Sequence, residues 1–203
     1  MFIQMKTMEQ MAREVIRSGH GLARTRDLLA AGVHPRVLYR MRDEGRILSL
    51  SRGLFQLPEE VPDEPDLSIV AQKIPSGVIC LISALSFHGI TTEIPAKVSV
   101  ALRRGSEKPR LAYPPLRFFW MSGRAFEEGI ERHPLNGATL SVYSAEKTLA
   151  DCFKYRNKIG MDVVLEALKL YRERFRFDAN RLMQYARVCR VESVMKPYLE
   201  AVL

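Results

Sequence analysis

Residues 25–57 read TRDLLAAGVHPRVLYRMRDEGRILSLSRGLFQL, and their pattern predicts two short helices, a tight turn between them and a β-hairpin after them. Thr25 can serve as the N-cap of a first helix that runs through Ala31, because its hydroxyl can accept a hydrogen bond from a free amide of the first turn. Pro35 opens the second helix at the first helical position, where the missing N–H of proline costs nothing. We expect this helix to end near Glu44, with Gly45 as its cap, since glycine suits the left-handed conformation that follows a helix.

The second helix has an apolar side and a basic, aromatic side. At about 100° per residue, the positions divide into Val37, Leu38 and Met41 on one side and Arg36, Tyr39, Arg40 and Asp43 on the other. An arginine pair at positions i and i+4 can enter a DNA major groove, where arginine binds O6 and N7 of guanine. The pattern therefore predicts DNA recognition by Arg36, Tyr39 and Arg40.

The hairpin after this helix adds a basic tip. Residues 47–50 and 54–57 flank the turn Ser51-Arg52-Gly53, in which Gly53 can take the positive φ that the tip requires. Arg52 would then reach a phosphate or the minor groove, and the whole unit is a winged helix-turn-helix. The alternative is the same scaffold used for protein contacts alone, since one fold can serve several functions.

Composition limits the class of protein. The chain has 203 residues, 47% of them hydrophobic, so it has room for one large or two small domains with a real core. Its net charge of +8 favours polyanionic partners such as DNA or RNA, or an acidic protein.

Cys80, Cys152 and Cys189 are far apart and odd in number, which predicts neither a disulfide framework nor a zinc site and favours the cytoplasm. No stretch approaches the roughly 20 apolar residues that span a bilayer, so we expect neither membrane insertion nor export.

An acidic, proline-rich stretch divides the chain. Residues 5–18 are amphipathic and form the first helix of an N-terminal domain over residues 1–58. Residues 58–66, PEEVPDEPD, hold three prolines and five carboxylates without a basic residue, which is typical of an extended, solvated segment. We place a linker at residues 59–66 and a second domain at residues 67–203.

The second domain has the pattern of an α+β fold. A helix around residues 67–73 is followed by apolar or alternating stretches that indicate the strands of a small mixed or antiparallel sheet, at residues 78–82, 97–102, 117–121, 130–133 and 139–143. Asn136-Gly137 is a hairpin turn between the last two. The remainder is helical, at residues 145–158, 162–174, 179–190 and 192–203, with Ser144 and Asp178 as N-caps. We expect these helices to cover one face of the sheet.

Residues that carry catalysis are not apparent in the sequence. The four histidines are scattered without metal-ligand spacing, and no phosphate-binding glycine loop or serine elbow occurs. Asp151 and Cys152 are adjacent on a predicted helix and so point about 100° apart, which favours a buried structural cysteine over an activated nucleophile. We therefore expect no enzyme, no cofactor, no metal and no catalytic residue.

A second basic region lies near the C-terminus. Its cations include Lys169, Arg172, Arg176, Arg181, Arg187 and Arg190. They indicate either a solvated helix surface or a second face for a polyanion or an acidic partner, and the sequence leaves both readings open.

Three stretches together resemble a known family. These are GVHPRVLYRMRDEGRILSLSRGLFQLP at residues 32–58, ICLISALSFHGI at residues 79–90 and SVYSAEKTLADCF at residues 141–153, followed by a helical tail. In this order they resemble the antitoxins of abortive-infection type IV toxin–antitoxin systems, the AbiEi-like transcriptional regulators.

The resemblance implies a two-gene operon that defends against phage. In such a system the N-terminal winged helix represses its own promoter at inverted repeats, and the C-terminal domain neutralises a nucleotidyltransferase-like toxin without requiring a stable complex. It places DNA contacts on Arg36, Tyr39, Arg40 and Arg52 and assigns no catalytic residue. The alternative function is a non-catalytic helper subunit whose winged helix docks on a protein or an RNA.

Overall fold

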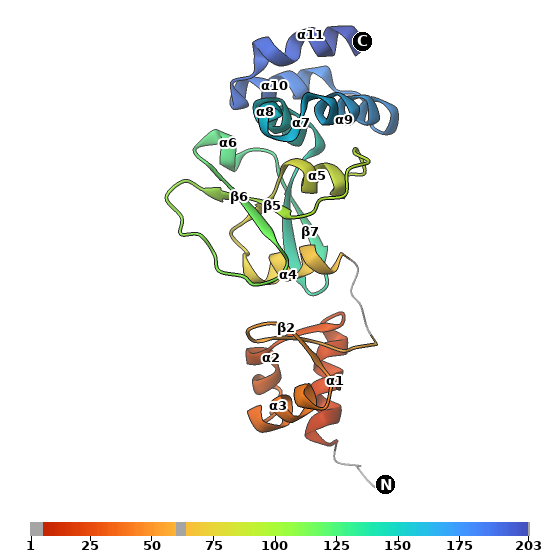
Figure 1. The fold of residues 1–203 in the computed structure, drawn as a ribbon, viewed down its shortest axis with the longest axis vertical. Coiled ribbons are helices and arrows are strands. Elements are labelled where there is room, and N and C mark those ends of the chain that lie inside the picture. Colours follow the sequence, from red (N-terminus) through yellow and green to blue (C-terminus); the bar gives the residue numbers. More distant parts are fainter. Residues whose placement is uncertain (1–5, 60–63, 203) are drawn as a thin grey trace.

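The structure is a computed structural model that describes residues 6–59 and 64–202. It forms two lobes that follow one another along the longest axis (Figure 1). We call residues 6–59 the N-terminal lobe and residues 64–202 the C-terminal lobe. Each lobe contains helices and one sheet, of three and five strands, so the predicted α+β class is confirmed.

The N-terminal lobe packs three helices against a small antiparallel sheet. Its elements are α1 (Met8–Ser18), β1 (Leu22–Arg24), α2 (Thr25–Ala30), α3 (Pro35–Asp43), β2 (Leu48–Ser51) and β3 (Leu54–Gln56). The strand order is β1-β3-β2, so β3 lies in the middle of three strands rather than in a two-stranded hairpin. The buried side chains of Ile16, Leu28, Leu38 and Met41 form the centre of the core between the helices.

The helix boundaries follow the caps that the sequence predicts, with one correction. Pro35 is the first residue of α3, and Gly45 has a φ of +70° just after it, both as predicted. Thr25, however, is the first residue of α2 and not its N-cap; Arg24 holds that position without a side-chain hydrogen bond. The reason is long-range, because the backbone N–H of Thr25 donates to the carbonyl of Gly53 at 3.1 Å and joins α2 to the hairpin turn.

The C-terminal lobe is built on a mixed sheet in the order β6-β5-β4-β8-β7. Its elements are α4 (Pro65–Lys73), β4 (Val78–Ile79), α5 (Leu81–Phe87), β5 (Val98–Arg103), β6 (Leu116–Met121), α6 (Arg124–Glu127), β7 (Ile130–Leu135), β8 (Ala138–Tyr143), α7 (Ala145–Lys154), α8 (Arg156–Ile159), α9 (Met161–Arg174), α10 (Ala179–Cys189) and α11 (Glu192–Val202). β5 pairs parallel with β6, and β4 pairs parallel with β8, whereas the other neighbours are antiparallel. All five predicted strands are present, but the first is shorter than predicted: β4 covers only Val78–Ile79, because α5 begins at Leu81.

Helices cover both faces of this sheet, which corrects the prediction of a single covered face. Val98, Val100 and Leu102 pack with α4, whereas Ala101 between them joins the cluster that α5, α7, α9 and α10 form on the other side. The alternation along β5 therefore points toward two cores. The sequence order concealed this arrangement, since α4 precedes every strand of the sheet it covers.

The C-terminal helices begin at the predicted caps. Ser144 accepts a hydrogen bond from the backbone N–H of Lys147, and Asp178 accepts one from that of Arg181. The helix predicted over residues 145–158 is broken at Tyr155, where α7 ends and α8 begins. No glycine or proline marks this break in the sequence.

The two lobes touch through α4. Ile69 of α4 is buried in a small apolar cluster with Leu22 of β1 and Leu54 of β3. Because α4 begins at Pro65, the last two residues of the predicted linker are helical. Glu59, at its other end, forms an ion pair with Arg13 of α1, and residues 60–63 of the linker lie outside the described residues.

Candidate nucleic-acid interface

Helix α3 presents the predicted basic face to the surface. Its N-cap is His34, whose ring Nδ1 accepts a hydrogen bond from the backbone N–H of Arg36 at 3.2 Å. Leu38 and Met41 are buried in the core of the lobe, which fixes the rotation of the helix. Arg36, Tyr39 and Arg40 are consequently exposed, and the structure brings these three predicted residues together on one helix face.

Tyr39 forms part of a larger basic surface than the sequence indicated. Tyr39 is 53% exposed, and the guanidinium carbon of Arg42 lies 5.1 Å from the centre of its ring. Arg42 was not among the predicted residues, and it forms an ion pair with Asp43 at 2.7 Å. The stacking on Tyr39 was the available signal, since residues three apart are neighbours on a helix.

Glu9 of α1 holds two arginines of this surface. Its carboxylate accepts from Arg40 Nη2 at 2.6 Å and also forms an ion pair with Arg46, which lies just beyond α3. No side-chain ion pair of Arg36 is found in the described part of the chain. The α1 carboxylate thus orients Arg40 while lowering the net positive charge beside it.

Arg52 lies elsewhere. It is exposed in the turn between β2 and β3, where Gly53 has the predicted positive φ of +71°. Its carbonyl accepts a hydrogen bond from Nζ of Lys73 at 2.7 Å, which ties the turn to the end of α4. Figure 1 shows the β2 hairpin on the side of the N-terminal lobe that faces the C-terminal lobe, with α3 on the opposite side. The structure therefore does not group Arg52 with the α3 residues.

The second predicted basic region is divided in the structure. Its six residues are exposed and lie on or just after α9 and α10: Lys169, Arg172, Arg176, Arg181, Arg187 and Arg190. Arg181 Nε is 3.5 Å from Glu146, whereas Arg187 and Arg190 line a recess of about 590 Å³ with other cations. Those other cations are Arg104, Arg124 and Lys154. The sequence did not indicate this grouping, because the five basic residues of the recess come from four separate segments of the chain. Only the fold brings these segments together.

A buried polar cluster lies under α7. Nζ of Lys147 donates to Asp151 at 2.6 Å and lies 4.1 Å from the centre of the Tyr143 ring, and the thiol of Cys189 donates to the same carboxylate at 3.1 Å. Burial and the nearby charge of Asp151 raise the pKa of the Cys152 thiol well above its usual range. Cys152 is 0% exposed, which confirms the predicted buried cysteine. Within residues 6–59 and 64–202 no group of three His, Cys, Asp or Glu side chains is arranged to hold a metal ion.

The N-terminal lobe matches a known family model. Residues 10–58 match the family described as "Transcriptional regulator, AbiEi antitoxin". Over these residues the N-terminal lobe is similar to AbiEi antitoxin regulators. The match runs from within α1 to just past β3 and therefore includes the exposed face of α3. The resemblance to AbiEi regulators is thus confirmed for this part of the chain.

The N-terminal lobe and most of the chain after it share a fold with a solved structure. This is the crystal structure of the RV2827C protein from Mycobacterium tuberculosis, with a TM-score of 0.63 and 14% sequence identity, covering 88% of this chain and 70% of that one. At this identity the likeness concerns the fold alone. No curated protein matches the chain. Among the described residues, no helix has both the length and the apolar character needed to cross a membrane.

Proposed function

We propose that this protein is the antitoxin and autorepressor of a two-gene type IV toxin–antitoxin system. The observation that carries the proposal is the exposed face of α3, which joins Arg36, Tyr39 and Arg40 within the segment that matches AbiEi regulators. In this proposal the N-terminal lobe is a winged helix-turn-helix, with α3 as the recognition helix in the major groove and the β2–β3 hairpin as the wing. Inverted repeats in the promoter would be the binding site.

The C-terminal lobe is proposed to neutralise a nucleotidyltransferase-like toxin in the cytoplasm. The family description of the N-terminal lobe as that of an antitoxin supports this role. The division of labour places repression in residues 1–58 and neutralisation in residues 67–203. Arg187 and Arg190, with the cations around them, are the strongest candidates for a second anionic contact, since their recess is lined by five basic and no acidic residues.

Binding to the DNA upstream of the gene tests the repressor role. We expect the wild-type protein to bind this DNA more tightly than a scrambled duplex in fluorescence anisotropy. Arg36→Ala should weaken the binding free energy by about 1–3 kcal/mol on the operator and by much less on the scrambled duplex, because a bidentate contact to guanine is lost. Lys196→Ala is the matched control, since Lys196 is an exposed cation on α11, in the other lobe. Equal weakening by Arg36→Ala on both duplexes would assign this residue to phosphate contacts instead.

Growth rescue tests the antitoxin role separately. Co-expression with the product of the adjacent gene should protect cells when the full chain is present. Arg36→Ala should retain that protection while losing repression. Loss of protection together with repression would overturn the proposed division between the lobes.

A further inference from the structure

An open recess lies where the two lobes meet. Its volume is about 960 Å³, within the range of roughly 300–1,000 Å³ that small-molecule sites occupy. We call it the interlobe recess. Its walls are the β2–β3 turn, the end of α4, the loop before β6 and β6 itself, with Ser51, Arg52, Lys73, Ile74, residues 108–112, Leu116 and Phe118 as lining residues.

The charge of the interlobe recess has one sign. Arg52, Lys73, Lys108 and Arg110 line it, and no acidic residue does. In residues 6–59 and 64–202, none of these four cations has a carboxylate partner in an ion pair. Burial and the charge of Arg24 lower the pKa of Lys73, so its charged form is less favoured here than in water. A bound anion would stabilise that charged form.

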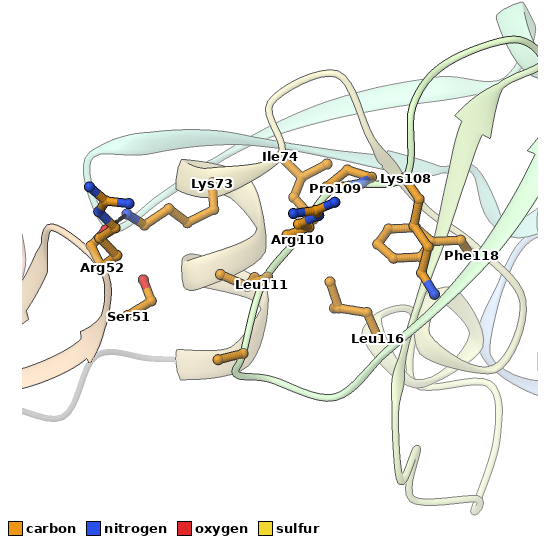
Figure 2. A pocket seen from close by; sticks show the side chains of 11 residues that line it. Ser51, Arg52, Lys73, Ile74, Lys108, Pro109, Arg110, Leu111, Leu116 and Phe118 are labelled. Carbon is orange, nitrogen blue, oxygen red and sulfur yellow. Dashed lines mark hydrogen bonds between the residues drawn. The ribbon is translucent and has the colours of Figure 1, made fainter.

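An apolar surface accompanies these cations. Leu116 and Phe118 alternate along β6 and are half-buried, and Ile74 at the end of α4 is buried. Nζ of Lys108 lies 5.9 Å from the centre of the Phe118 ring. Figure 2 shows Arg52 and Lys73 at one end of the recess, Lys108 and Phe118 at the other, and Arg110 between them. The recess thus has a cationic end and an aromatic end.

We propose that the interlobe recess binds a nucleoside di- or triphosphate. The base would lie against Phe118 and Lys108, because an aromatic ring and a cation both attract the face of a base. The phosphate groups would lie between Arg52, Lys73 and Arg110, whose positive charges would offset most of the negative charge of such a ligand. A compact ligand with one flat end and one highly charged end fits this division better than an acidic peptide, whose charges are spread along an extended chain.

Binding at this site has a consequence for the wing. Arg52 cannot contact a bound nucleotide and DNA at once, so the nucleotide should weaken DNA binding. This coupling depends on the proposed repressor function, whereas nucleotide binding itself does not. The two are therefore measured separately.

Isothermal titration calorimetry of the full chain without DNA tests the site. The probes are ATP, GTP, CTP and UTP, with inorganic tripolyphosphate and the free nucleosides as partial ligands. We expect at least one triphosphate to bind with 1:1 stoichiometry and at least about tenfold more tightly than tripolyphosphate or its own nucleoside. Arg110→Gln, on an exposed loop, should weaken the nucleotide by about tenfold, because a charge-assisted contact is lost.

Phe118→Leu separates a nucleotide site from a simple anion site. It should weaken the nucleotide while leaving tripolyphosphate binding unchanged, and circular dichroism checks that the variant is folded. Lys196→Gln is the control for general charge and should change neither affinity. Failure of all four triphosphates to bind would overturn the proposal. So would equal binding of tripolyphosphate, displacement of the nucleotide by a glutamate-rich peptide at the same affinity, or an equal loss with Lys196→Gln.

Fluorescence anisotropy with operator DNA then tests the coupling. The bound nucleotide should reduce DNA affinity in the wild type, and Arg110→Gln should need about tenfold more nucleotide for the same reduction. Unchanged DNA affinity in the wild type would refute the coupling alone. If the protein binds nucleotide but no DNA, the repressor function is refuted and the proposal that the recess binds a nucleotide stands.

Discussion

Lys147 and Asp151 form an ion pair that is almost wholly removed from water. Their side chains are 0% and 1% exposed, and the two charged atoms lie 2.6 Å apart, one turn along α7. We predict that Lys147→Met destabilises the C-terminal lobe by about 3–5 kcal/mol, because it leaves a buried carboxylate without its cation. The thiol of Cys189, which also donates to Asp151, is too weak a donor to replace it.

The same chain holds a matched control. Lys196 and Glu200 on α11 have the same i, i+4 spacing and the same kinds of charge, but their side chains are 63% and 61% exposed. Lys196→Met should cost about 0–1 kcal/mol, since an exposed pair is screened by water. The difference between the two variants isolates the effect of burial.

Urea unfolding followed by Trp120 fluorescence measures both variants. Trp120 is the single tryptophan of the chain and lies on β6, so it reports on the C-terminal lobe. The double variant Lys147→Met with Asp151→Leu should recover most of the lost stability, because apolar residues can replace a buried pair at little net cost. Equal losses of unfolding free energy in Lys147→Met and Lys196→Met would refute this reasoning. So would a double variant whose loss equals the sum of the losses in Lys147→Met and Asp151→Leu alone.

Three further predictions concern the lobes and DNA. Glu9→Gln should raise DNA affinity by roughly threefold in anisotropy titrations, because it removes a carboxylate beside Arg40; weaker binding would mean that Glu9 is needed to orient that arginine. Arg52→Ala should lower the slope of log K against log salt by about 0.9 if the wing contacts a phosphate, and an unchanged slope would show that Arg52 does not. Ile69→Ala should destabilise the full chain by about 2–5 kcal/mol in urea unfolding but leave a fragment of residues 64–203 almost unaffected, since Leu22 and Leu54 are its interlobe partners.

Local signals in the sequence were sufficient for the face of α3. Pro35 fixed its start, and the spacing of Leu38 and Met41 fixed which side faces the core. Asn136 and Gly137 likewise form the predicted hairpin turn, with φ values of +46° and +74°. In each case the decisive interaction is short in sequence, so the residues themselves contain the information.

Contacts between segments that are distant in the sequence could not be predicted from local patterns. Glu9 and Arg40 are 31 residues apart, and their contact depends on how α1 packs against α3. β1 is three residues long, too short for an alternating pattern, and exists because β3 pairs with it. The spacing of Lys147 and Asp151 was visible in the sequence, but their burial follows from the helices packed around α7.

Helix α4 shows why the position of Arg52 was also hidden. Residues 67–72 of α4 are all buried, because the five-stranded sheet covers one side of the helix and the apolar cluster of Ile69, Leu22 and Leu54 covers another. A helix enclosed on two sides has no single apolar stripe, so its sequence gives no sign that a second lobe rests on it. Once Ile69 and Lys73 hold β3 and the β2–β3 turn, Arg52 is placed beside α4 rather than beside α3. For Arg52 to reach DNA together with Arg36, the hydrogen bond from Lys73 to the carbonyl of Arg52 must open, or the DNA must extend around the lobe. Either requirement would make α4 the element through which the C-terminal lobe influences the proposed DNA binding.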